Sequence, residues 1–126
     1  MKIFISMPMK GKTPLQIKNM RKEVEEIILK ECPDAEFIDT FIDEDLEEKH
    51  PGFKYLAKSI ELLDQADIFV YKTEWLHSRG CFVEYVAAMY YDIDMVELNT
   101  LRQARMARDA FEKFGKILEK KGITVE

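Results

Sequence analysis

The sequence predicts an α/β fold, in which helices cover both faces of a flavodoxin- or Rossmann-like parallel sheet of about four to five strands, giving three layers. Three observations favour this class. Short apolar runs alternate with longer stretches of helical periodicity along the chain. Proline and glycine stand at several of the junctions. The length of 126 residues is that of one domain, which we expect to span residues 1–126.

The order of the segments predicts parallel strands, because each crossover helix returns the chain to the same end of the sheet. Thr13 followed by Pro14 is typical of a helix start, since threonine caps the helix and proline fits its first position. Pro33 ends that helix. The expected elements are, in chain order, a strand over 2–6, a helix over 14–30, a strand over 35–39, a helix over 53–65, a strand over 67–71, a helix over 80–91, a strand over 94–98 and a helix over 102–121.

Composition excludes several function classes. A net charge of −5 argues against a nucleic-acid partner held by phosphate neutralisation. Every apolar run is shorter than the roughly 20 residues that cross a bilayer, so we expect no membrane partner. The apolar start is also too short for a signal peptide. Cys32 and Cys81 form neither a disulfide framework nor a metal-type pair, and His50 and His77 suggest no metal site. We expect a reduced, cytoplasmic protein without a metal or cofactor.

The segment from Trp75 to Glu84 carries the strongest chemical signal. It follows the predicted strand over 67–71, and ligands of open α/β folds bind at the carboxyl ends of strands. Trp75 is available to stack on a base. Ser78, Arg79 and Gly80 supply a hydroxyl, a cation and backbone N–H groups. We expect Glu84 in the first turn of the following helix, beside a buried face formed by Val83, Val86, Ala87 and Tyr90.

A second loop follows the first predicted strand, over residues 6–12. Its backbone N–H groups and its two lysines, Lys10 and Lys12, could hold an anion. The loop lacks the glycine patterns of both the dinucleotide-binding turn and the P-loop. A solvated turn is an equally weighted alternative. The acidic stretch Asp43–Glu48 is expected to be exposed and could lie over the site.

Three segments together resemble the nucleoside 2-deoxyribosyltransferase-like superfamily, in particular a short branch common in bacteria and phages and related to 2′-deoxynucleoside 5′-phosphate N-hydrolases. They are the run from Lys2 to Gly11, the run from Leu62 to Asp67, and the stretch from Trp75 to Glu84 with Ala87 after it. The last contains W-x-x-S-R-G-x-x-x-E, the more specific element. The resemblance covers residues 1–98, so the C-terminal helix within 101–126 lies beyond the family core.

The resemblance implies cleavage or transfer at an N-glycosidic bond. Family enzymes use a glutamate at the position of Glu84 to attack the anomeric carbon, and water or a second base resolves the glycosyl-enzyme. In the N-hydrolases a serine at the position of Ser78 contacts the 5′-phosphate. Together with Arg79, Lys10 and the backbone of residues 9–11, this favours a (deoxy)nucleoside 5′-monophosphate. Family members usually form dimers, so a homodimer is expected by analogy.

Two positions depart from the family pattern. A tyrosine that orients the nucleophile is replaced by Phe4, and an aspartate that acts near the leaving base is replaced by Ser59. Asp64 could substitute only if the helix register shifts. The candidate site residues are Glu84 as nucleophile; Ser6, Met7, Pro8, Met9, Lys10, Gly11, Trp75, Ser78, Arg79 and Gly80 for substrate binding; and Ser59, Asp64 and Asp67 on the base side.

Three hypotheses follow for the function. The first is an N-glycosidase or deoxyribosyltransferase in which Glu84 is the nucleophile. The second is a non-catalytic nucleotide-binding or nucleotide-sensing protein, which Phe4 and Ser59 favour. The third is an interaction protein that acts through its C-terminal helix, since residues 101–126 carry seven basic and four acidic side chains within an acidic chain. For that helix we prefer an amphipathic element that closes the domain or a dimer.

Overall fold

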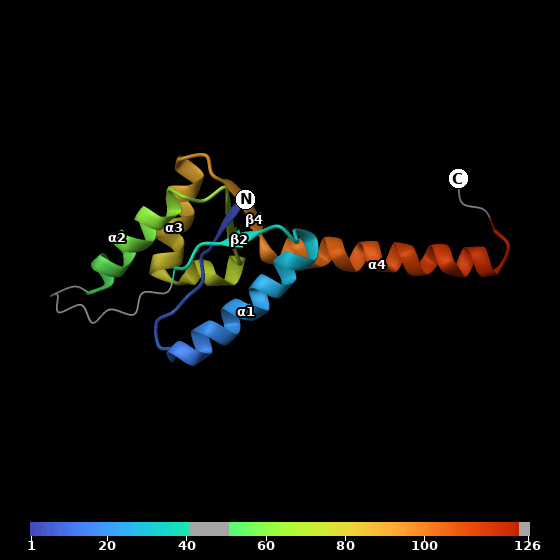
Figure 1. Ribbon diagram of the computed structural model, residues 1–126, viewed down its shortest axis with the longest axis horizontal. Helices are drawn as coiled ribbons and strands as arrows, with labels where there is room; N and C mark the ends of the chain where they lie inside the picture. Colours follow the sequence, from blue (N-terminus) through green and yellow to red (C-terminus); the bar gives the residue numbers. More distant parts are fainter. Residues whose placement is uncertain (41–50, 124–126) are drawn as a thin grey trace.

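The computed structural model describes residues 1–40 and 51–123, and it confirms the predicted α/β class. Four parallel strands form one sheet in the order β2-β1-β3-β4, with helices on both faces (Figure 1). This is the order of flavodoxin-like sheets. The acidic stretch 43–48 lies outside the described residues.

The observed elements follow the predicted alternation, with shifted boundaries and one unpredicted 3₁₀ helix. They are β1 (Lys2–Ile5), α1 (Pro14–Glu31), β2 (Glu36–Phe37), α2 (Pro51–Leu63), β3 (Ile68–Tyr71), the 3₁₀ helix η1 (Thr73–His77), α3 (Arg79–Tyr90), β4 (Asp94–Glu97) and α4 (Leu98–Lys120). The predicted start of α1 is confirmed. The Thr13 hydroxyl accepts from the Gln16 N–H at 3.2 Å, and the Gln16 side chain accepts from the Thr13 N–H at 2.9 Å.

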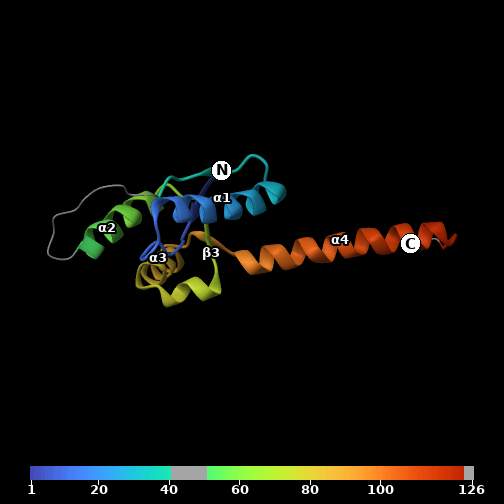
Figure 2. The ribbon, with the colours of Figure 1, turned by 90° about the horizontal axis from the view of Figure 1, so that it is seen from below.

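Two apolar clusters hold the three layers together. On one face of the sheet, Ile3 and Ile5 of β1 pack with α1, whose buried residues are Ile17, Val24 and Ile28. On the other face, Phe4 and Phe69 stack with ring centroids 5.8 Å apart, among residues of α2 and α3. In Figure 2, α1 and α3 lie on opposite sides of β3. Because successive side chains of a strand point to opposite faces of the sheet, neighbouring residues of β1 and of β3 pack in different clusters.

Contacts to the start of α4 hold η1 in place. Asn99 Nδ2 donates to the Glu74 carboxylate at 3.0 Å, and the Thr73 N–H donates to Glu97 Oε1 at 3.4 Å. Glu97 also caps α4 by accepting from the N–H groups of Asn99 and Thr100, both at 3.0 Å. This cap explains why α4 begins at Leu98 rather than at the predicted residue 102.

The predicted buried face of α3 is wrong. Val83 is 41% exposed and Tyr90 is 76% exposed, and the helix instead buries Cys81, Glu84 and Ala88. Glu84 is the sixth residue of α3, so it also lies beyond the first turn in which we expected it. This orientation packs Ala88 among Phe4, Leu63 and Phe69, and it brings Glu84 to a polar partner on the sheet, described below.

The C-terminal end of α3, where we expected Tyr90 to be buried, carries several exposed large side chains. Met89, Tyr90 and Tyr91 are all exposed, and only Met95, in β4, packs against a core cluster. Helical spacing shows which residues share a face, but not that this face is buried.

Helix α4 contacts the rest of the protein near its start. Leu98 is buried and Leu101 packs against the cluster on the α1 side, while Arg108 forms an ion pair with Glu31 at the end of α1. Beyond this point α4 extends away from the sheet, and neither view shows another described helix or strand beside it (Figures 1 and 2). Among the described residues, no helix combines the length and apolarity needed to cross a membrane.

Candidate active site

A buried hydrogen bond joins two sequence-predicted site residues from opposite parts of the chain. The Ser6 hydroxyl donates to Glu84 Oε1 at 3.0 Å, and both side chains are buried. Ser6 directly follows β1, where its N–H donates to the Val70 carbonyl of β3 at 2.9 Å. Glu84 reaches this point from the second turn of α3. The structure thus places a carboxylate at the carboxyl ends of the two central strands.

This position is the topological switch point of the sheet. After β1 the chain passes through α1 to β2, on one side, and after β3 it passes through α3 to β4, on the other. The two connections diverge from neighbouring strands and cover opposite faces, which is the arrangement at which open α/β folds form a ligand-binding crevice. Ligands of open α/β proteins bind in this crevice, so the location of Glu84 is that of a ligand-facing group.

Burial dominates the electrostatics of Glu84. Loss of hydration raises the pKa of this carboxyl from an ordinary value of 4.5 to about 7, and the hydrogen bond from Ser6 acts in the opposite direction. The helix N-terminus stabilises the ionised form of Glu84 only weakly, because the helix dipole acts mainly within the first turn. Glu84 is therefore a carboxyl that exchanges its proton near neutral pH.

Cys81 connects this pair to the predicted phosphate contact. It lies one turn before Glu84 on α3 and is buried. Burial raises the pKa of its thiol, and the nearby hydroxyls of Ser6 and Ser78 act in the opposite direction. Ser6, Ser78, Cys81 and Glu84 thus form one polar cluster. The sequence did not point to Cys81, whose spacing of three from Glu84 was the available signal.

The predicted anion-binding side chains lie at exposed positions on the two segments that also carry this cluster. Lys10 and Arg79 are exposed, on the loop after β1 and at the first residue of α3. Gly11 adopts a φ of +78°, which glycine tolerates without strain, and the Lys12 N–H donates to the Met9 carbonyl at 3.2 Å. The loop is therefore an ordered turn. Gly80 has open space around its Cα, so crowding does not require glycine there.

Other predicted binding residues serve the core in whole or in part. Met7 is buried and Met9 packs against the α1-side cluster, so they offer a ligand mainly their backbone; Pro8, between them, is half-buried. Trp75 is also half-buried against this cluster, with Lys72 Nζ 5.8 Å from its ring centroid. A base stacked on Trp75 would compete with that lysine.

The two departures from the family pattern are both buried. Phe4 has no exposed surface and stacks on Phe69, so its ring serves the core. Ser59 on α2 is buried as well. Neither side chain can supply a proton as a carboxylic acid would.

The two base-side carboxylates lie at the opposite edge of the sheet. Asp67 precedes β3 and accepts from the Lys2 N–H at 2.7 Å, while its own N–H donates to the Lys2 carbonyl at 2.8 Å. Asp64 is exposed in the turn after α2 that leads to this same edge. The structure does not bring either residue to Glu84, because the amino and carboxyl ends of a strand lie on opposite edges of a sheet.

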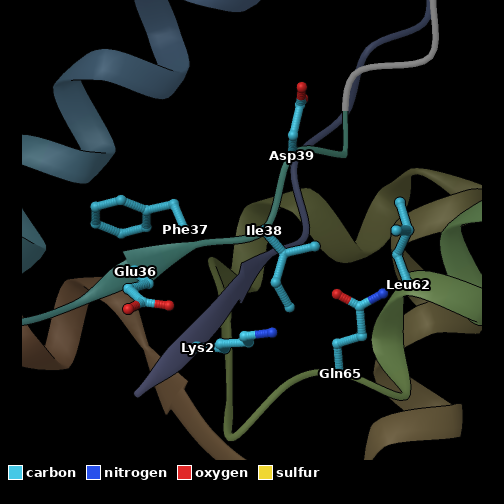
Figure 3. A pocket seen from close by; sticks show the side chains of 7 residues that line it. All are labelled: Lys2, Glu36, Phe37, Ile38, Asp39, Leu62 and Gln65. Atoms are coloured by element: carbon cyan, nitrogen blue, oxygen red, sulfur yellow. The ribbon is translucent and has the colours of Figure 1, made fainter.

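A cavity of about 330 Å³ lies elsewhere, between β2, the start of β1 and the end of α2. The side chains of Lys2, Ile38 and Gln65 extend toward it (Figure 3). Lys2, Glu36, Asp39 and Gln65 are exposed, so its polar groups are hydrated. We place the site at Glu84 rather than here because Glu84 combines burial, a raised pKa and a position at the switch point.

Comparison with known proteins gives no further guide. No protein-family model matches the chain, and no curated protein or solved structure shows significant similarity to it. Within residues 1–40 and 51–123, no group of three or more His, Cys, Asp or Glu side chains is arranged to hold a metal ion. The functional argument therefore depends on the geometry around Glu84.

Glu84 should destabilise the folded protein at alkaline pH. Its pKa is higher in the folded than in the unfolded chain, so the folded state gains stability from the bound proton below about pH 4.5 and loses it as the pH rises through about 7. We expect Glu84→Gln, relative to the wild type, to gain about 2–3 kcal/mol in free energy of unfolding between pH 4 and pH 8. Urea unfolding at both pH values measures this gain. The matched change at the exposed Glu26 should give the same difference at both, and an equal result for Glu84 would contradict its burial.

Proposed function

We propose that the protein cleaves or transfers the N-glycosidic bond of a (deoxy)nucleoside 5′-monophosphate, with Glu84 as the nucleophile. The observation that carries the proposal is the buried Ser6–Glu84 pair at the carboxyl ends of β1 and β3. A carboxylate in a water-poor site is suited to an electron-poor sugar carbon, and a pKa of about 7 keeps a large fraction ionised at neutral pH.

The reaction would proceed in two displacements. Ionised Glu84 attacks the anomeric carbon, and the bond to the base breaks with its electron pair passing to the base nitrogen, which takes a proton from water. An ester then links Glu84 to the sugar. Water or a second base attacks the same carbon, releases Glu84 as a carboxylate and completes hydrolysis or transfer. The Ser6 hydroxyl, 3.0 Å from Oε1, orients the carboxylate through both steps.

The substrate phosphate is assigned from charge and position. Ser78 lies in the same polar cluster as Glu84, and Arg79 begins α3, whose N-terminal N–H groups face an anion favourably. Lys10 follows β1 on the neighbouring strand end. A 5′-phosphate at these groups would be separated from the anomeric carbon by the sugar, as a nucleoside monophosphate requires.

Base release by the wild-type protein tests the proposal. Incubation with each of the common deoxynucleoside and ribonucleoside 5′-monophosphates should liberate free base, detected by chromatography. The rate should rise with pH through about 7 as Glu84 ionises. Without an acid beside the base, turnover should fall about 10²–10⁴-fold short of enzymes that have one. Absence of free base from every nucleotide would reject catalysis.

A second candidate is a nucleotide-binding protein that uses the same pocket without turnover. The buried Phe4 and Ser59 favour it, because neither offers the phenol or carboxylic acid of the family pattern. Isothermal titration calorimetry separates the two functions. Binding of a nucleoside monophosphate without base release supports this candidate, whereas binding with release supports the enzyme.

A further inference from the structure

Helix α4 carries an apolar stripe that its own domain leaves uncovered. The stripe consists of five residues spaced alternately three and four positions apart: Ala104, Ala107, Phe111, Phe114 and Leu118. Ile117 widens it toward the C-terminal end of the helix. Phe111 is 77% exposed and Phe114 is 56% exposed. Two large rings so exposed on one helix face exceed what isolated surface residues explain, and such faces mark interaction sites.

The stripe points away from the body of the protein. The contacts with the body come from a different row of α4, which contains the buried Leu98, Leu101 and the ion-paired Arg108. At 3.6 residues per turn, that row lies about 120° around the helix from the stripe. The contacts by which α4 packs against its own domain therefore leave the aromatic stripe without a packing partner among the described residues.

The distal half of α4 also needs support as a helix. Segments shorter than about 12–15 residues are marginal helices in water without tertiary packing. Gly115 weakens this half by about 1 kcal/mol relative to alanine. Packing of the stripe against a partner is the interaction that would stabilise it.

We propose that the partner is a second copy of this chain, whose α4 packs antiparallel on the stripe. Size complementarity determines the direction, because small residues occupy the first half of the stripe and large ones the second. An antiparallel pairing centred on residue 109 places Ala104 opposite the partner's Phe114 and Ala107 opposite the partner's Phe111. A parallel pairing would instead set rings against rings and alanines against alanines, leaving gaps.

Phe111 and Phe114 of both copies would bury roughly 400–650 Å², about a third of a standard interface. Ile117 and Leu118 extend the contact area. An anionic membrane suits the stripe less well, because residues 1–100 carry twelve basic and twenty acidic side chains and would be repelled.

The mass in solution tests the interface. Sedimentation equilibrium should give about twice the 14.9 kDa of the chain, and Phe114→Glu should weaken the dimer at least ~100-fold. Lys116→Gln, which changes the charge equally on the opposite side of α4, should leave the dimer intact. Because Phe114 is largely exposed in the single chain, circular dichroism should show that the α/β domain of the variant still folds, with any loss of helix confined to the distal half of α4. A monomeric wild type, or a Phe114→Glu dimer of full strength, would overturn the proposal.

Cross-linking tests the direction. In a Cys32→Ser background, Thr100→Cys and Leu118→Cys chains should form a disulfide with each other when mixed, because antiparallel pairing brings these positions together. Neither chain should cross-link to itself. Disulfides within each single variant would show a parallel pair, and monomers that bind anionic vesicles would show a lipid partner; either result contradicts the proposal.

Discussion

Replacing Glu84 by glutamine should reduce base release at least ~10³-fold while the protein remains folded. Removing a nucleophile of comparable chemistry reduces turnover by up to about 10⁶-fold, because no other group can form the covalent intermediate. The amide keeps the size of the carboxyl but cannot form the glycosyl ester. Chromatography of the free base under single-turnover conditions measures the loss.

Asp64→Asn is the matched control for this experiment. It also converts a carboxylate to an amide, but at an exposed position on the opposite edge of the sheet. Its rate should equal that of the wild type. Full activity in Glu84→Gln, or loss of activity in Asp64→Asn, would move the chemistry away from the switch point and refute the assigned nucleophile.

Phe69→Ala should lower the free energy of unfolding by about 3–5 kcal/mol, because it leaves a cavity at the centre of the sheet. Phe69 has no exposed surface, and its ring packs on Phe4 of the neighbouring strand and on Tyr71. For a chain of this size the loss corresponds to a fall in Tm on the order of 10–20 °C. Urea and thermal unfolding measure both quantities.

The control is Phe82→Ala, the same change at a half-exposed position on α3. It should cost within about 1 kcal/mol, because little apolar area is lost from the core. Equal losses for the two variants would contradict the assignment of Phe69 to the core.

The features that depend on neighbouring residues could be predicted from the sequence. Thr13 and Pro14 start a helix by local hydrogen bonding and backbone preference, and the structure confirms that start. The rotation of α3 could not be predicted in this way. The partners of the buried face come from distant parts of the chain, such as Ser6, 78 residues from Glu84, and the periodicity of α3 contains no information about them.

The position of the base-side residues was predicted wrongly for a different reason. Asp67 precedes its strand, so the rule that selected Trp75–Glu84 at the carboxyl ends would have placed Asp67 at the opposite edge. Here the sequence contained the information. For η1, by contrast, the stabilising contacts come from Glu97 at the end of β4 and Asn99 at the start of α4, so local preference could not reveal that helix.

The position of β1 has a consequence for how the protein folds. This first strand lies between β2 and β3, and the residue that follows it bonds to Glu84, 78 positions further along the chain. During synthesis, β1 can therefore pair with β3 only after about 65 further residues have been added. Such distant pairing is slow, because the entropy cost of closing a long loop comes before any native contact stabilises the chain. The Ser6–Glu84 pair is thus assembled late, and the appearance of activity during refolding would report completion of the central sheet.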